Sequence, residues 1–181
     1  MNPRIKALLT IPLLALRLAA GLPDPPETAS TFSLKRHDSA GSVSLADFAG
    51  EILVIDFFAH WCVPCGKSAP LIENEIRKHY LRSGGNSNGV PVRVLSVNVD
   101  QEDPKGTARF IARHQPGVVV DDVDGETFRR YGGKTMPRLV VVDGTHGAAG
   151  GSGFKIVHTE NAFSGAAALR RIIDGIGKAA Q

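Results

Sequence analysis

The stretch Ile52-Leu-Val-Ile-Asp-Phe-Phe-Ala-His-Trp-Cys-Val-Pro-Cys65 joins an apolar strand to a closely spaced pair of cysteines. Residues 52–58 are almost all apolar and strand-forming, which is typical of a central strand covered on both faces. Cys62 and Cys65, the only cysteines of the chain, lie where this predicted strand ends and a helix is predicted to begin. The sequence therefore predicts a dithiol or disulfide at the junction between a buried strand and a helix.

Alternating strands and helices extend along the rest of the chain. Three more runs rich in β-branched residues are predicted as strands, at residues 90–99, 139–142 and 154–157. Three helices are predicted from apolar stripes and capping residues, beginning near Cys62, at Asp103-Pro104 and at Ser164. This alternation predicts an α/β fold with helices on both faces of the sheet, with an antiparallel last strand pair. The glycine-rich segments 83–89 and 143–153 are predicted to be flexible connections.

Composition and charge restrict the class of protein. The chain has 181 residues, of which 43% are hydrophobic and 22% charged, as in a soluble globular protein of one domain. The net charge of +3 comes from the first 20 residues, which hold three of the 21 basic residues and no acid. The remaining 18 basic and 18 acidic residues balance, so nothing indicates a nucleic-acid partner.

The N-terminus has the organisation of a secretory signal. Arg4 and Lys6 precede an apolar run over residues 7–16, and small residues follow before Gly21. We expect a signal peptide at 1–20, an extended linker at 21–29 and a single folded domain at 30–181, outside the cytoplasm, whether periplasmic or secreted. The alternative is an uncleaved amphipathic tail, and membrane association is expected, if at all, only through this segment.

The spacing of the cysteines predicts redox chemistry. A disulfide between Cys62 and Cys65 closes almost no loop, so it contributes little as a structural crosslink. At a helix start the first thiol lies where backbone N–H groups and the helix dipole favour the thiolate. Cys62 is therefore expected to be the more exposed, attacking thiol and Cys65 the resolving thiol. Half of a zinc site and an inert pair are the alternatives; neither a second cysteine pair nor a paired histidine motif supports the zinc site.

Several motifs together resemble the thioredoxin superfamily, and more narrowly its extracytoplasmic TlpA-like thioredoxin/redoxin branch, over about residues 30–176. The motifs are Asp56–Cys65 with Pro70, Tyr131–Leu139, Phe32–Leu34, Val43–Leu45 with Gly50, Val97–Asp100 and Asp124-Gly125. The resemblance implies a thioredoxin fold with a central mixed sheet. The chain departs from the branch at Ser68, where Glu is frequent, at Phe58, where Trp is frequent, and at Asp56, where Asn is common.

The neighbours of the cysteines have expected roles. Burial in an apolar strand should raise the pKa of Asp56 and suit it to accept a proton from Cys65; a purely structural Asp is the alternative. The resemblance implies that Pro137 follows a cis peptide bond, which would let the Met136 backbone pair with an extended target peptide. An ordinary turn proline is the alternative. Trp61 is expected to shield one side of the pair or simply to pack there.

These features predict a thiol–disulfide oxidoreductase, more narrowly a protein-disulfide reductase, that uses Cys62 and Cys65 and needs no cofactor or metal. Its partners would be protein thiols and disulfides and an upstream protein that donates or accepts electrons. An alternative that is not an enzyme is a metallochaperone, which would bind Cu(I) through the two thiols with His60 as a further ligand. A binding module that merely keeps the fold is a third alternative, which the intact cysteine pair disfavours.

Overall fold

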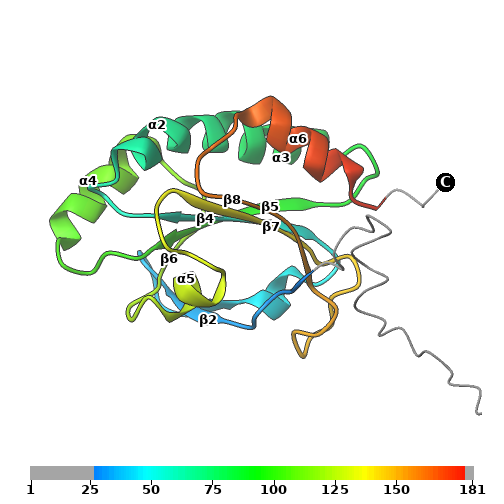
Figure 1. Ribbon diagram of the computed structural model, residues 1–181, viewed down its shortest axis with the longest axis horizontal. Coiled ribbons are helices and arrows are strands. Elements are labelled where there is room, and N and C mark those ends of the chain that lie inside the picture. The colour runs from blue at the N-terminus through cyan, green and yellow to red at the C-terminus, as the bar shows by residue number, and fades with distance from the viewer. Residues whose placement is uncertain (1–26, 178–181) are drawn as a thin grey trace, which may run out of the picture.

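The computed structural model describes residues 27–177, and Figure 1 shows a curved sheet with helices packed against it. The expected signal peptide at 1–20 and residues 21–26 of the expected linker lie outside the described residues. The eight strands are β1 (Glu27–Thr28), β2 (Ser33–Arg36), β3 (Ser42–Ser44), β4 (Ile52–Phe58), β5 (Val92–Asn98), β6 (Val119–Asp121), β7 (Arg138–Asp143) and β8 (Lys155–Glu160). The helical segments are η1 (Leu45–Phe48), α2 (Val63–Leu71), η2 (Ile72–Arg77), α3 (Lys78–Ser83), α4 (Pro104–His114), α5 (Glu126–Arg130) and α6 (Ala166–Gly175).

The sheet is mixed, with the order β1-β8-β7-β4-β5-β6-β2-β3. Strand β4 lies inside it, parallel to β5 on one side and antiparallel to β7 on the other. All seven residues of β4 are buried, which explains why its sequence does not alternate between apolar and polar residues. Strands β7 and β8 are antiparallel, as predicted.

Helices cover both faces of the sheet, as predicted. Helices α2, α3, α4 and α6 lie along one face, whereas α5 and the strongly curved edge with β2 lie on the other (Figure 1). Alternate residues of β4 supply the two main cores: Ile52 and Val54 pack on the α2–α6 side, and Leu53, Ile55 and Phe57 on the other. A third, smaller cluster forms where β4 ends and holds both cysteines.

The helix that follows the cysteines changes character at Pro70. Proline has no N–H to donate to the carbonyl four residues earlier, and its ring clashes with that carbonyl. The regular helix α2 accordingly gives way to the π-helical segment η2 immediately after Leu71. The helix then resumes as α3 and ends at Gly84, which has a φ of 76°.

Several local expectations need correction. The last helix is preceded by Gly165 as its N-cap and has no side-chain cap, so Ser164 does not cap it. Segment 83–89 is attached to the last helix by hydrogen bonds. The buried amide of Asn86 donates to the carbonyl oxygens of Ile173 and Ile176 at 2.8 and 3.0 Å. The glycine-rich turn after β7 is also held by backbone hydrogen bonds, such as Gly144 N–H to Glu51 O at 3.0 Å.

Candidate active site

The cysteine pair lies at the start of α2 and is closed as a disulfide. Cys62 is the N-cap residue of the helix, and its Sγ accepts a hydrogen bond from the backbone N–H of Cys65 at 3.2 Å. This amide would favour a thiolate on Cys62 after reduction, since it belongs to the positive end of the helix. Val63 and Pro64 occupy the first turn of α2. An N–H group in the first turn has no acceptor within the helix, so the missing N–H of proline costs no hydrogen bond there.

The two cysteines differ less in exposure than the sequence suggested. Cys62 is 4% exposed and Cys65 is 2% exposed, because both pack into the cluster at the end of β4. Cys62, and not Cys65, nevertheless lines a groove of about 770 Å³ that is open to solvent. The groove gives an incoming sulfur a route to Cys62, whereas Cys65 lies behind it.

Asp56 is the buried carboxyl of the site. It lies on β4 between Ser96 of β5 and Leu139 of β7, and only 5% of its surface is exposed. Its Oδ1 has no hydrogen-bond partner within residues 27–177, and burial raises the pKa of Asp56 to about 7. An unpaired carboxyl in apolar surroundings favours the neutral form, so Asp56 can gain or lose a proton near neutral pH.

A second buried carboxyl, Glu73, lies near Asp56 and was missed by the sequence reasoning. Both residues line a cavity of about 10 Å³, about enough for one water molecule. Glu73 accepts a hydrogen bond from Nε of Arg77 at 2.6 Å and is 3.5 Å from Nζ of Lys78, so cations compensate its charge. Ala69 lines the same cavity and also packs in the cysteine cluster, which links the cavity to Cys65.

The segment around Pro137 lies beside the cysteines. The Met136–Pro137 peptide bond is cis, and Met136 packs against the cluster that contains Cys62 and Cys65. Pro137 lines a mostly apolar groove of about 290 Å³ together with Pro64 and Ser68 of α2 and Phe163. The Ser68 hydroxyl donates to the carbonyl of Cys65 at 3.2 Å, so this position supplies no carboxylate to the groove.

His60 and Trp61, which precede the disulfide, are less buried than the two cysteines. Trp61 is 61% exposed, so it presents its ring to solvent next to Cys62. His60 is held by carboxylates: its Nδ1 lies 2.7 Å from Oδ2 of Asp100, without hydrogen-bond alignment, and its Nε2 lies 3.5 Å from Oδ2 of Asp103. Within residues 27–177 no group of three or more His, Cys, Asp or Glu side chains could hold a metal ion.

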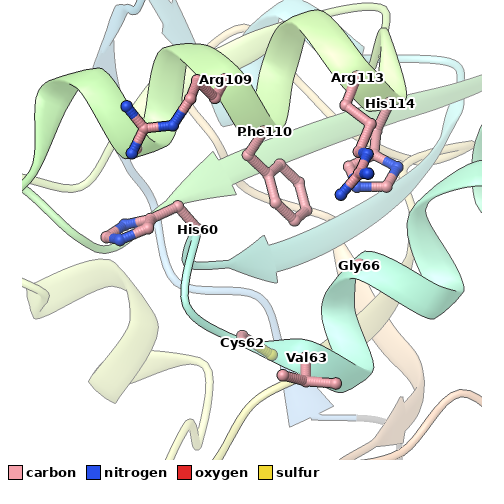
Figure 2. Close-up of a pocket in the computed structure, with 9 residues that line it drawn as sticks. His60, Cys62, Val63, Gly66, Arg109, Phe110, Arg113 and His114 are labelled. Carbon is pink, nitrogen blue, oxygen red and sulfur yellow. The ribbon is translucent and has the colours of Figure 1, made fainter.

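Sequence reasoning also missed the wall of the groove beside Cys62. Figure 2 shows Arg109, Phe110, Arg113 and His114 of α4 on one side and Cys62, Val63 and Gly66 on the other. Phe110 and His114 could be read from the sequence as part of a helix. Their position beside Cys62 depends on how α4 packs on α2, for which the sequence carries no signal.

A helix that begins at a Cys-X-X-Cys pair after a central strand of a mixed sheet, with a cis-proline segment beside it, is the arrangement of the thioredoxin superfamily. The model of the redoxin family matches residues 25–162, and the chain belongs to this family.

Individual relatives agree with this assignment. The chain is 28% identical to a candidate thiol:disulfide interchange protein DsbE from Chlorobium tepidum; the match covers 83% of this chain and 95% of that one, with a TM-score of 0.66. It is 26% identical over 102 residues to the thiol-disulfide oxidoreductase ResA of Bacillus thuringiensis, which is 56% of this chain and 54% of that protein. StoA from Bacillus subtilis, 19% identical with 81% and 98% of the chains covered, shares the fold at a TM-score of 0.59. The chain thus spans about half the length of the curated relatives it matches.

Proposed function

We propose that this protein is a thiol–disulfide oxidoreductase, and more narrowly a protein-disulfide reductase, that acts through Cys62 and Cys65. The observation that carries this proposal is the Cys62–Cys65 disulfide at the start of α2, where Cys62, and not Cys65, lines an open groove. The names of the relatives from Chlorobium tepidum and Bacillus thuringiensis support the same reaction class.

The reaction would proceed in two exchanges. In the reduced protein, the Cys62 thiolate attacks one sulfur of a substrate disulfide, and the other substrate sulfur leaves as a thiolate. The Cys65 thiolate then attacks Sγ of Cys62, which forms the protein disulfide and releases the second substrate sulfur. Two electrons pass from the protein dithiol to the substrate, and the two thiol protons end on the substrate thiols. Asp56 would accept the proton of Cys65 before the second exchange.

The segment at Met136 and Pro137 would bind the substrate backbone. An extended peptide can pair with the backbone of such a segment, with its side chains entering the adjacent grooves. The apolar groove at Pro64 and Phe163 supports this role. Trp61, exposed next to Cys62, would contact the partner.

The direction of electron flow is tested by the reduction potential of the cysteine pair. We expect a value near that of thioredoxin, about −270 mV, after equilibration against glutathione buffers, because a reductase must be a stronger donor than its substrates. A value near −120 mV, typical of strongly oxidising members of the fold, would make the protein an oxidant.

Substitution of the resolving cysteine tests the division of roles. Cys65→Ser leaves an attacking thiol that cannot be released, so mixed disulfides with partner proteins should accumulate as reductant-sensitive bands on non-reducing gels. Cys62→Ser is the matched control and should give almost none. Equal loss of Cu(I) affinity in both variants, with few adducts in either, would instead identify a metal carrier.

We also propose that residues 1–20 are a signal peptide, that 21–29 link it to the domain at 30–181, and that the protein works outside the cytoplasm, in the periplasm or as a secreted protein. The basic residues before an apolar ten-residue run support this. Strand β1 already begins at Glu27, within the linker. Within the described residues no helix is long and apolar enough to cross a membrane. N-terminal sequencing of exported protein should find a start near Gly21; an intact Met1 in a cytoplasmic pool would refute export.

A further inference from the structure

The groove beside Cys62 has an apolar floor and a cationic rim. Phe110 forms the floor and is buried by stacking on Phe58, with ring centroids 4.7 Å apart. Figure 2 shows Arg109 and Arg113 on α4 above this floor, on either side of the Phe110 ring. The two arginines are four residues apart and thus share one face of the helix. Cys62 lies at the opposite wall, so an occupant would lie between the arginines and Cys62.

The positive charge of the rim is only partly compensated. Nη2 of Arg109 lies 3.6 Å from Oδ2 of Asp103, whose other oxygen already accepts the N–H of Gly106 at 2.8 Å. Arg113 is exposed and has no ion-pair partner within the described part of the chain. Burial, and then the charge of Arg113, lowers the pKa of His114, so this histidine is neutral at neutral pH. Arg113 is therefore the cation available to a ligand.

Gly66 of α2 leaves room in the groove. A Cβ added at Gly66 of α2 would lie 3.7 Å from Nε2 of His114 and 3.9 Å from Cε2 of Phe110, which is ordinary contact. The α2 wall therefore presents bare backbone toward α4, and a longer side chain at position 66 would enter the groove. A glycine inside a helix is less favourable than alanine, so helix stability does not explain the presence of Gly66 here.

We propose that this groove binds an acidic side chain that flanks the disulfide of a partner protein, so that the protein selects substrates with Asp or Glu near the reactive cystine. The inference rests on the proposed oxidoreductase function and names its substrate class. A peptide fits better than a small anion because the groove, at about 770 Å³, exceeds what one carboxylate fills, and because Trp61 and Val63 beside it are 61% and 69% exposed. Charge complementarity at such a surface acts mainly on association and on partner choice.

The step itself is the exchange described above. The acidic side chain would pair with Arg113 while the neighbouring substrate sulfur lies against Cys62. The Cys62 thiolate then forms the mixed disulfide, and the departing substrate thiolate takes up a proton. The arginine does not enter the bond changes; it positions the substrate.

The test compares two peptide disulfides that are identical except for Glu or Lys beside the cystine. The dithiothreitol-reduced protein, freed of reductant, is mixed with each peptide in a stopped-flow instrument, and the second-order rate constant is measured. We expect the Glu peptide to react about fivefold faster, in line with an ion pair worth up to about 1 kcal/mol, and the preference to shrink at high salt. Arg113→Glu should abolish or reverse the preference. Arg82→Glu, at an exposed arginine of α3, is the matched control and should keep it.

Gly66→Met provides a second variant that needs no change of charge. It should slow the Glu peptide by filling the groove, while thermal unfolding shows that the variant is folded. Equal rates for the two peptides with wild-type protein would overturn the acidic-partner inference while leaving the oxidoreductase function intact. No reaction with either peptide would refute the function itself. If Arg113→Glu slows glutathione disulfide as much as the Glu peptide, the groove is a site for small anions and the protein-partner inference is wrong.

Discussion

Asp56 combines a cost to the fold with a protonation equilibrium that the proposed reaction would use. Its carboxyl lies in the centre of the sheet without a compensating cation, unlike Glu73 beside it, which pairs with Arg77. Desolvation therefore acts on Asp56 unopposed and raises its pKa to about 7. A carboxyl group with this pKa is partly protonated at neutral pH, whereas an ordinary surface aspartate is ionised.

Asp56→Asn should stabilise the protein above neutral pH. In the wild type the folded-state pKa lies above the value of 3.8 for the exposed group, so the folded state binds the proton more tightly. Stability is accordingly lost as the pH rises from about 4 to about 7, by at most about 4 kcal/mol. The amide carries no charge and should not show this loss. Urea unfolding at pH 4 and pH 8 measures it; a wild type and variant with the same pH dependence would contradict the burial argument.

The same substitution tests the catalytic role. Asp56→Asn should slow resolution by Cys65 more than the initial attack by Cys62, since the amide cannot accept a proton. Stopped-flow measurement with a disulfide substrate separates the two steps. Equal slowing of both, or of neither, would leave Asp56 with a structural role only.

At the scale of elements, two helical glycines line the groove beside Cys62 for different reasons. A Cβ at Gly66 of α2 would make only ordinary contacts, 3.7 Å from the nearest atom, whereas a Cβ at Gly106 of α4 would lie 2.5 Å from both the His60 ring and the Asp103 carboxylate. The first turn of α4 can approach the end of β4 only because position 106 has no side chain. Sequence patterns treat the two glycines alike.

Alanine at these positions should have opposite effects. Gly106→Ala should destabilise the protein by about 1–3 kcal/mol, because the methyl group must displace His60 or the helix cap. Gly66→Ala is the matched control and should be neutral or stabilising by up to about 1 kcal/mol. Chemical denaturation of both variants measures the difference. Equal effects would mean that the close approach of His60 to α4 is not a constraint.

For the molecule as a whole, Asn86 ties the middle of the chain to its last helix. Its buried amide donates to the carbonyls at 173 and 176, and its Oδ1 accepts the N–H groups of Asn88 and Val90, each at 3.0 Å. The amide of Asn86 thus caps the C-terminal end of α6, where the N–H of Ile176 also donates to the Ile173 carbonyl. Its bonds to this helix end join segments that are almost ninety residues apart.

Asn86→Ala should lower the free energy of unfolding by about 1–3 kcal/mol, since it removes two buried hydrogen bonds to the end of α6 and the acceptor of two backbone N–H groups. Hydrogen exchange should show the largest loss of protection in α6. Asn88→Ala, at an exposed neighbour that donates to carbonyls of the same helix end, is the control and should cost less. A uniform loss of protection over the whole sheet would argue against a local role.

Much of the architecture could be predicted because long apolar runs allow few solutions. Strands β4, β5, β7 and β8 and the helices α2, α4 and α6 follow from periodicity and capping. The short strands β2, β3 and β6 and the five-residue helix α5 carry little periodic signal of their own. They exist because neighbouring chain segments supply their hydrogen bonds and cover their apolar sides.

The sequence by itself determined the cysteine pair, the helix start that places Cys62 at its N-cap, and the apolar strand that buries Asp56. Each depends on residues close together in the chain. Only the tertiary structure decided which residues surround them: Glu73 beside Asp56, and Arg109, Phe110 and Arg113 across a groove from Cys62. The physical reason is that packing between α2, α4 and the sheet is set by the fit of many side chains distant in sequence, which no local pattern encodes.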